Sequence, residues 1–380
     1  MTSKLEGLIA KLCPNGVEYK KIGDIADYEQ PTKYIVKSTK YDDSFTTPVL
    51  TAGQSFILGY TDELDNIYLA SKDNPVIIFD DFTGAIQWVD FPFKVKSSAM
   101  KMIMAKPNVL IRYLYHWMSL LGFSSSEHKR LWISTYSNFE IPVPPLEIQE
   151  EIVRILDTFT ELTAELTAEL TARKNQYEYY RDTLLTFGDN NPLHSLISHY
   201  CPNGVEYKVL SDVSDMKRGT TVTKKSVNPG DIPVISGGRE PAYYCDTFNR
   251  NGETITVAGS GAGAGFVQYW NKPIFVCDAF SVKGVYDLTL TKFLYYVLLS
   301  KQEAIYSTKK GGGVPHVHIS SIKDFEIPVP PLEVQHQIVQ ILDRFDALCN
   351  DLTQGLPAEI EARRKQYEYY RDQLLNFKRA

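Results

Sequence analysis

Three short motifs in this sequence contain residue types that can carry out chemistry. Residues 259–264, Gly-Ser-Gly-Ala-Gly-Ala, fit the glycine pattern of a dinucleotide-binding turn after a strand-like segment. Such a turn must open a helix whose N-terminus faces the pyrophosphate. The chain instead continues as GFVQYWNKPIFV, with aromatic and strand-forming residues and a proline. We therefore predict a glycine-rich hairpin or a loop that faces a nucleic acid.

The other two motifs could bind a metal ion. His316 and His318 form H-x-H, but no third ligand is evident nearby, so we expect a structural or nucleic-acid-facing pair. Asp80 and Asp81 stand outside any metal or nuclease pattern, which favours a capped turn. The Asn-Pro-Pro-aromatic motif of amino-methyltransferases and the phosphate-binding loop G-x-x-x-x-G-K-[ST] are both absent from the sequence. The sequence predicts no catalytic residues and no metal site.

Basic residues that could contact a phosphate backbone gather in two segments, each in front of a Pro-x-Pro-Pro motif. Hydroxyl groups and glycines accompany them, which suits approach by side chains and backbone amides. The candidates in the first segment are His128, Lys129, Arg130, Ser134 and Tyr136, and those in the second are Thr308, Lys309, Lys310 and His316. Further candidates are Lys217, Arg218, Lys224, Lys225 and Arg239. For each of them, a solvated charged loop is the alternative.

The charge of the chain is unevenly distributed. The formal net charge is −6. Residues 139–187 carry 4 basic against 10 acidic residues, whereas residues 205–324 carry 14 basic against 11 acidic ones. A surface that binds nucleic acid could therefore lie outside the acidic helical stretches without making the whole chain basic.

The chain is a tandem repeat of one unit of roughly 190 residues, much longer than a solenoid repeat. Three blocks recur in the same order: CPNGVEYK at 13–20 and 201–208, FEIPVPPLE at 139–147 and 325–333, and QYEYYRD at 176–182 and 366–372. The inserts between them, residues 21–138 and 209–324, share almost no sequence. A fixed frame around variable inserts is typical of a recognition protein.

Each copy contains a long predicted helix after its proline motif. No Gly or Pro interrupts residues 146–187, and apolar residues such as Ile148, Ile152, Ile155 and Phe159 follow a heptad pattern. Gly188 is expected to cap this helix. The second helix contains Gly355 and Pro357, so we expect a break there. A narrow apolar seam needs a partner, so internal two-fold pseudosymmetry predicts that the two helices pair antiparallel.

The inserts have the pattern of α/β domains with one common fold. TTPVLTA, NPVIIFDD, GETITVAG and KPIFVCDAF predict short strands, and LIRYLYHWMSLLG and LTKFLYYVLLSKQ predict a late helix in each insert. We predict a short N-terminal helix with the first globular domain (1–138), a central helix (139–188), the second globular domain (189–324) and a C-terminal helix (325–380).

The order of these blocks resembles that of specificity (S) subunits of type I restriction-modification systems. The motif from Pro142 to Gln149, its repeat from Pro328 to Gln335, the TAEL repeat of the central helix and the QYEYYRD blocks carry the resemblance, which covers essentially the whole chain. It implies an α/β (α+β) fold with two target recognition domains separated by two long antiparallel coiled-coil helices. Each domain would read one half of a split target in double-stranded DNA, and the segment before each proline motif would lie against DNA.

The resemblance also implies partners. Two methyltransferase (M) subunits would methylate adenine with S-adenosylmethionine, and restriction (R) subunits would join through the complex and use ATP and Mg²⁺. This chain would bind no cofactor and would have no catalytic site of its own.

Bulk properties agree with a cytoplasmic protein. The five cysteines are scattered without C-x-x-C, and neither a secretory signal nor an apolar run long enough to span a membrane is present. Three alternatives stay open: a coiled-coil scaffold with two globular heads that does not bind DNA, an enzyme with an unrecognised site in one insert, and a specificity subunit of a methylation-only system.

Overall fold

The chain divides into two compact units, each with one globular domain and one end of the helical frame. The computed structural model describes residues 3–51, 55–123, 129–311 and 313–380. The first unit comprises Met1–Leu166 and Ile360–Ala380, and the second comprises Thr167–Glu359. None of the described helices is both long enough and apolar enough to cross a membrane.

The globular domain of the first unit contains two small sheets. The four-stranded sheet is antiparallel, with the order β2 (Ala26–Glu29), β8 (Met100–Ala105), β5 (Val76–Asp80), β6 (Ile86–Val89). The three-stranded sheet has the order β4 (Ile57–Thr61), β3 (Thr47–Leu50), β7 (Lys94–Val95), and β3 pairs with β7 in parallel. All five residues of β5 are buried, and its first four form a continuous apolar run before Asp80.

Short helices complete this domain and attach it to the frame. They are α1 (Ser3–Leu12), α2 (Ile22–Ile25), η1 (Pro31–Tyr34), α3 (Ile111–Leu121), α4 (Leu131–Ser134) and η2 (Tyr136–Asn138). The repeated blocks pair with each other, because β1 (Tyr19–Lys21) runs antiparallel to β9 (Glu140–Pro142). The insert therefore begins and ends at one two-stranded ribbon.

The second unit has the same plan although its insert has an unrelated sequence. Its four-stranded sheet has the order β11 (Ser214–Arg218), β17 (Ala279–Gly284), β14 (Glu253–Ala258), β15 (Val267–Asn271), and its three-stranded sheet the order β13 (Tyr243–Cys245), β12 (Ile232–Ile235), β16 (Phe275–Val276). The ribbon is β10 (Glu206–Val209) with β18 (Glu326–Val329). The helices are α6 (His194–Tyr200), α7 (Leu210–Val213), α8 (Thr291–Ser300), α9 (Gln302–Ser307) and α10 (Ile319–Ile322). The predicted α/β class and the common fold of the inserts are confirmed.

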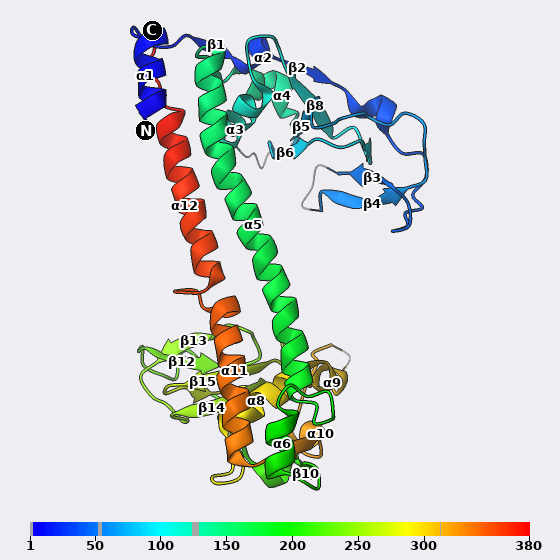
Figure 1. Cartoon of the computed structure of the whole chain (residues 1–380), viewed down its shortest axis with the longest axis vertical. Helices are drawn as coiled ribbons and strands as arrows, with labels where there is room; N and C mark the ends of the chain where they lie inside the picture. The colour runs from blue at the N-terminus through cyan, green and yellow to red at the C-terminus, as the bar shows by residue number, and fades with distance from the viewer. Residues whose placement is uncertain (1–2, 52–54, 124–128, 312) are drawn as a thin grey trace. The chain divides into compact units, whose positions relative to one another are not determined.

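The long helices follow the proline motifs as predicted (Figure 1). Helix α5 (Leu146–Leu184) has 39 residues, and the second helix is divided into α11 (Leu332–Asn350) and α12 (Leu356–Leu374). The break at residues 351–355 confirms the expectation drawn from Gly355 and Pro357.

The expected glycine cap of α5 is wrong. The helix ends at Leu184, and Gly188 is not among the glycines with positive φ. The carbonyls at the helix end are instead satisfied by Asn191, whose side-chain amide donates to the carbonyl oxygens of Thr183, Leu184 and Thr186 at 3.2, 3.0 and 2.9 Å. An asparagine seven residues beyond the helix therefore caps its C-terminal carbonyl groups, the role that the sequence pattern predicted for the glycine.

The helical seam is built from aromatic stacks and buried aliphatic residues within each unit. In the first unit, the start of α5 and the end of α12 run antiparallel with α1 beside them (Figure 1), and Phe159 stacks on Tyr370 with 5.2 Å between ring centroids. Ile148, Ile152 and Leu374 are buried in the core that these helices share. In the second unit, Tyr180 of α5 stacks on Phe345 of α11 at 5.3 Å. The predicted antiparallel pairing is confirmed.

Candidate nucleic-acid interface

The glutamine of the first proline motif locks α5 to its globular domain. The Gln149 side chain is fully buried. Its Oε1 accepts a hydrogen bond from the backbone N–H of Leu110 (2.9 Å), and its Nε2 donates to the carbonyl oxygens of Asn108 (3.0 Å) and Pro144 (2.7 Å). Leu110 is the N-cap residue of α3, so the amide satisfies polar backbone groups at the start of that helix.

The second motif repeats this joint. Gln335 is also fully buried, accepts from the N–H of Leu290 (2.8 Å), and donates to the carbonyl oxygens of Leu288 (2.9 Å) and Pro330 (2.8 Å). Leu290 is the N-cap residue of α8, the counterpart of α3. The motif glutamines are therefore positioning residues, because they fix the direction in which each globular domain leaves its long helix.

A charged contact reinforces the joint in the first unit. The Arg112 Nε donates to Oδ1 of Asp157 at 2.7 Å, and the buried His116 lies with Nε2 3.0 Å from the same oxygen and Nδ1 3.0 Å from the Tyr367 hydroxyl. Burial lowers the pKa of His116, although its bond to Asp157 acts in the opposite direction. Burial would raise the pKa of Asp157, but the bonds from His116 and Arg112 outweigh it, so that pKa lies below its ordinary value.

The second unit has the same contact with different residues. Lys292 lies 3.4 Å from Asp343, and the Tyr296 hydroxyl donates to the same carboxylate. An acidic residue on the long helix thus contacts the late helix of the globular domain in both units. Only the first unit has a histidine there.

The segment before each proline motif is attached to the same strand end in both units. The N–H of Leu131 donates to the carbonyl of Asp81 (2.8 Å), just after β5, and the N–H of Val317 donates to the carbonyl of Gly259 (3.0 Å), just after β14. Because these bonds are equivalent, Arg130 occupies the position of His316 in the shared fold. The two predicted segments therefore lie at equivalent places on the surfaces of their two domains.

The candidates of the first segment differ in how far the structure leaves them exposed. His128 lies outside the described residues. Lys129 is exposed, and the Arg130 side chain is 57% exposed, with its guanidinium 3.8 Å from the Asp81 carboxylate. Ser134 is exposed and donates to the Arg130 carbonyl at 2.7 Å. The sequence analysis missed Ile133, an exposed apolar side chain of α4 between these polar groups.

The prediction that Tyr136 contacts DNA is wrong. Tyr136 is only 1% exposed, packs against Phe79 and Phe139 with 4.7 and 5.5 Å between ring centroids, and donates from its hydroxyl to the Met118 carbonyl (3.1 Å). Burial raises the pKa of Tyr136 well above its usual value. The ring belongs to the core of the domain, so Tyr136 cannot contact DNA in this conformation.

The second segment forms a small hairpin. Lys310 and His316 exchange backbone hydrogen bonds of 3.0 and 2.8 Å around a turn in which Gly311 has φ of 109°, a conformation that favours glycine. The Lys309 ammonium lies 4.0 Å from the centroid of the Tyr306 ring, and the half-buried Thr308 donates to the Ile305 carbonyl at 2.8 Å. The hairpin thus presents Lys310 and His316 together.

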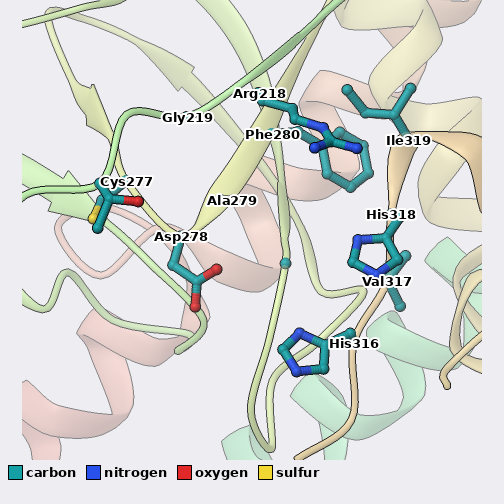
Figure 2. A pocket seen from close by; sticks show the side chains of 12 residues that line it. Arg218, Gly219, Cys277, Asp278, Ala279, Phe280, His316, Val317, His318 and Ile319 are labelled. Carbon is teal, nitrogen blue, oxygen red and sulfur yellow. The ribbon is translucent and has the colours of Figure 1, made fainter. Parts of the chain in front are cut away.

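The remaining candidates of the second unit are spread over its surface. Lys224 and Lys225 are exposed, Arg239 stacks over the Phe266 ring at 4.9 Å, and Lys217 pairs with Asp215 on the same strand. Of these five residues, only Arg218 lies beside a candidate of the second segment, because Arg218 and His316 line the same cavity (Figure 2).

The cavity of Arg218 and His316 has a volume of about 260 Å³. His318 and Asp278 also line it; His318 belongs to the pair that the sequence analysis expected to be structural or to face a nucleic acid, whereas Asp278 was not a candidate there. The rings of His316 and His318 are nearly parallel, with centroids 5.9 Å apart. The signal that could have identified Asp278 is the Cys-Asp pair that interrupts the strand pattern of KPIFVCDAF.

The remaining motifs have structural explanations. The glycine-rich segment is the turn between the antiparallel strands β14 and β15, with positive φ at Gly261 and Gly265, so the predicted hairpin is confirmed. Asp80 caps a turn, because its Oδ1 accepts from the N–H groups of Phe82 (2.8 Å) and Thr83 (3.1 Å), also as predicted. Among the described residues, no group of three or more His, Cys, Asp or Glu side chains could hold a metal ion.

Comparisons with known proteins agree on one family. A family model described as the type I restriction modification DNA specificity domain matches the chain twice, over residues 14–173 and 202–362. The specificity subunit of the type I restriction enzyme EcoR124I/EcoR124II from Escherichia coli is 43% identical, with 95% of this chain and 94% of that protein covered.

Solved structures are similar in fold. The crystal structure of a type I restriction-modification S subunit from M. genitalium has a TM-score of 0.68 at 15% identity, and the match covers 95% of this chain and 97% of that one. A chain solved in work on the complex assembly and conformational transition of the type I restriction-modification system has a TM-score of 0.55 at 18% identity, with coverage of 96% and 98%.

Proposed function

Since the chain belongs to the family of type I restriction-modification DNA specificity subunits, we propose that it reads a two-part DNA target, one half with each globular domain. One observation carries this proposal. Two inserts of unrelated sequence have the same sheet order and hold their basic segments at the same strand end. A common fold with different surface residues is what two readers of different half-sites need.

Methylome sequencing tests the proposal. Single-molecule sequencing of DNA from cells with and without this chain is expected to reveal a bipartite adenine-methylation motif that depends on the chain. Replacing residues 21–138 with the insert of another such protein should change one half of the motif and leave the other half unchanged. A motif with a single uninterrupted half, or no motif at all, would contradict the proposal.

The chain acts, in this proposal, without a catalytic site or cofactor of its own. The methyltransferase subunits would bring S-adenosylmethionine, and restriction subunits that join through the complex would bring ATP and Mg²⁺. The assembly would work in the cytoplasm, where its DNA substrate is found.

Two methyltransferase subunits would bind through the helical frame, and a duplicated surface supports this stoichiometry. Tyr179 on α5 and Tyr369 on α12 occupy the same position of the repeated block QYEYYRD, and they are 67% and 62% exposed. Each lies edge-on to the next tyrosine of its helix, with 5.6 and 5.5 Å between ring centroids. Exposed tyrosines at repeated positions suit a partner that binds twice, because tyrosine is enriched among the residues that dominate interface affinity.

Native mass spectrometry of the complex tests this surface. The unmodified chain should bind two methyltransferase subunits. Tyr179→Ala or Tyr369→Ala should weaken one of the two binding steps by about 30-fold or more, the loss expected when an interface hot spot is truncated. Tyr286→Ala is the matched control, since Tyr286 is 89% exposed but lies outside the frame. A stable complex with one methyltransferase that cannot add a second would contradict the proposed stoichiometry, and unchanged binding by both tyrosine variants would contradict the proposed surface.

A further inference from the structure

The two globular domains differ sharply at one equivalent position of their shared fold. Asp81 follows β5, donates from its N–H to the Ala99 carbonyl (3.0 Å) and accepts from the N–H of Leu131 (2.8 Å). Gly259 follows β14 and makes the same two backbone bonds, to Asp278 and from Val317, each at 3.0 Å. The two positions therefore share these backbone hydrogen bonds, whereas the side chains around them differ.

In the first domain, side chains close this position. The Asp81 carboxylate is buried and lies 3.2 Å from the ammonium of Lys101, which is buried as well. The other oxygen of Asp81 accepts from the N–H of Trp132 at 2.9 Å, and the Trp132 ring is buried against Phe79. Acid, base and indole side chains therefore occupy this position in the described part of the first domain.

In the second domain, the same place is open. Gly259 has no side chain, the position of Lys101 is taken by Phe280, and the position of Trp132 is taken by the exposed His318. The result is the cavity of about 260 Å³ shown in Figure 2, with Arg218, Asp278, His316 and His318 in its wall. The cavity thus accompanies smaller or exposed side chains at a position that keeps the same two backbone hydrogen bonds.

The wall of this cavity offers a donor and an acceptor of opposite charge. Arg218 and Phe280 both line the cavity in Figure 2, and no side-chain hydrogen bond or ion pair engages the Arg218 guanidinium among the described residues. Asp278 is exposed, and one of its oxygens accepts from the Ser260 hydroxyl, which leaves the other oxygen available. Arginine pairs with the O6 and N7 acceptors of guanine in the major groove, and aspartate accepts from the N4 amino group of cytosine.

We infer that this cavity reads a G·C base pair in the second half of the DNA target, with Arg218 on the guanine and Asp278 on the cytosine. The inference rests on the proposed function and adds the residues and the base pair for one domain. The closed position in the first domain has no counterpart of this reading pair. The two half-sites are therefore read with different chemistry at equivalent places.

Two substitutions test the inference in the assembled methyltransferase complex. Asp278→Asn removes the purely accepting carboxylate, and Arg218→Gln removes the charged donor. In the methylome, each should relax one G·C position of the second half-site and leave the first half-site unchanged. With duplexes that carry the exchanged base pair, discrimination at that position should fall by about 5- to 160-fold. Asp215→Asn is the control, because Asp215 is an exposed carboxylate of the same sheet that does not line the cavity.

Other outcomes overturn the inference. Weaker binding to every sequence with a smaller salt dependence would show phosphate contacts only, and unchanged discrimination would show no contact. If Ser260→Ala, which keeps the carboxylate but removes its hydrogen bond, relaxes the same position, the effect arises from the turn. These results would leave the proposed function intact, provided the unmodified chain still specifies a bipartite motif. If the unmodified chain specifies none, the proposed function fails and this inference fails with it.

Discussion

Replacing Gln149 by leucine should destabilise the first unit selectively. Leucine has a similar size, so the change removes three hydrogen bonds without opening a large cavity. The bond to the Pro144 carbonyl is fully buried and the one to the Leu110 N–H is partly buried, whereas Asn108 is exposed and its carbonyl can bind water. Two orphaned groups at about 1–3 kcal/mol each give a loss of about 2–6 kcal/mol.

Differential scanning calorimetry measures this loss. A domain of 150–250 residues loses about 2–4 °C in Tm per kcal/mol, so the transition of the first unit should fall by at least about 4 °C. Gln335→Leu should lower the transition of the second unit instead, because Gln335 makes the equivalent bonds there. Glu150→Gln is the control, since Glu150 is an exposed neighbour on α5. If Gln149→Leu shifted both transitions equally, or neither by more than the control, the glutamine would not be the joint between helix and domain.

Three further predictions concern DNA binding, pH and spacing. Lys129→Ala with Arg130→Ala, and separately Lys309→Ala with Lys310→Ala, should weaken DNA binding and flatten its salt dependence, because phosphate contacts release counterions; unchanged affinity and slope in titrations at several salt concentrations would contradict these contacts. Burial holds the pKa of His116 below its ordinary value of about 6.5, so the unfolded chain binds more protons and the first unit should lose stability as pH falls below about 6.5. Unfolding curves from pH 7.5 to 5 should show this loss, His116→Tyr should reduce it, and a loss of the same size in the variant would refute the assignment. An additional TAEL unit inserted at residues 163–166 adds about 6 Å and about 400° of helix, which keeps the seam aligned, and should lengthen the methylated motif's gap by roughly one to two base pairs. A two-residue insertion, about 200°, should disrupt packing, and an unchanged gap after the TAEL insertion would show that the helix does not set the spacing.

The sequence alone was sufficient for the features that depend on local pattern. The repeated blocks, the heptad positions of α5, the break near Gly355 and the strands of both inserts follow from periodicity, turn residues and internal comparison. The resemblance identified the family because it rests on contiguous motifs. The structure reproduces these features because each is encoded within a few successive turns or strands.

The tertiary structure decided which side chains are available for binding. Tyr136 and Arg130 both stand in the same basic-looking segment, but only the fold buries the first against Phe79 and leaves the second exposed. The end of α5 depends on Asn191, and the role of Gln149 depends on Leu110, a residue 39 positions away. Asp81 and Gly259 share no sequence context, and they became comparable only through equivalent backbone hydrogen bonds. Exposure and hydrogen bonding arise from contacts between distant segments, and those contacts are not written in the local pattern of residues.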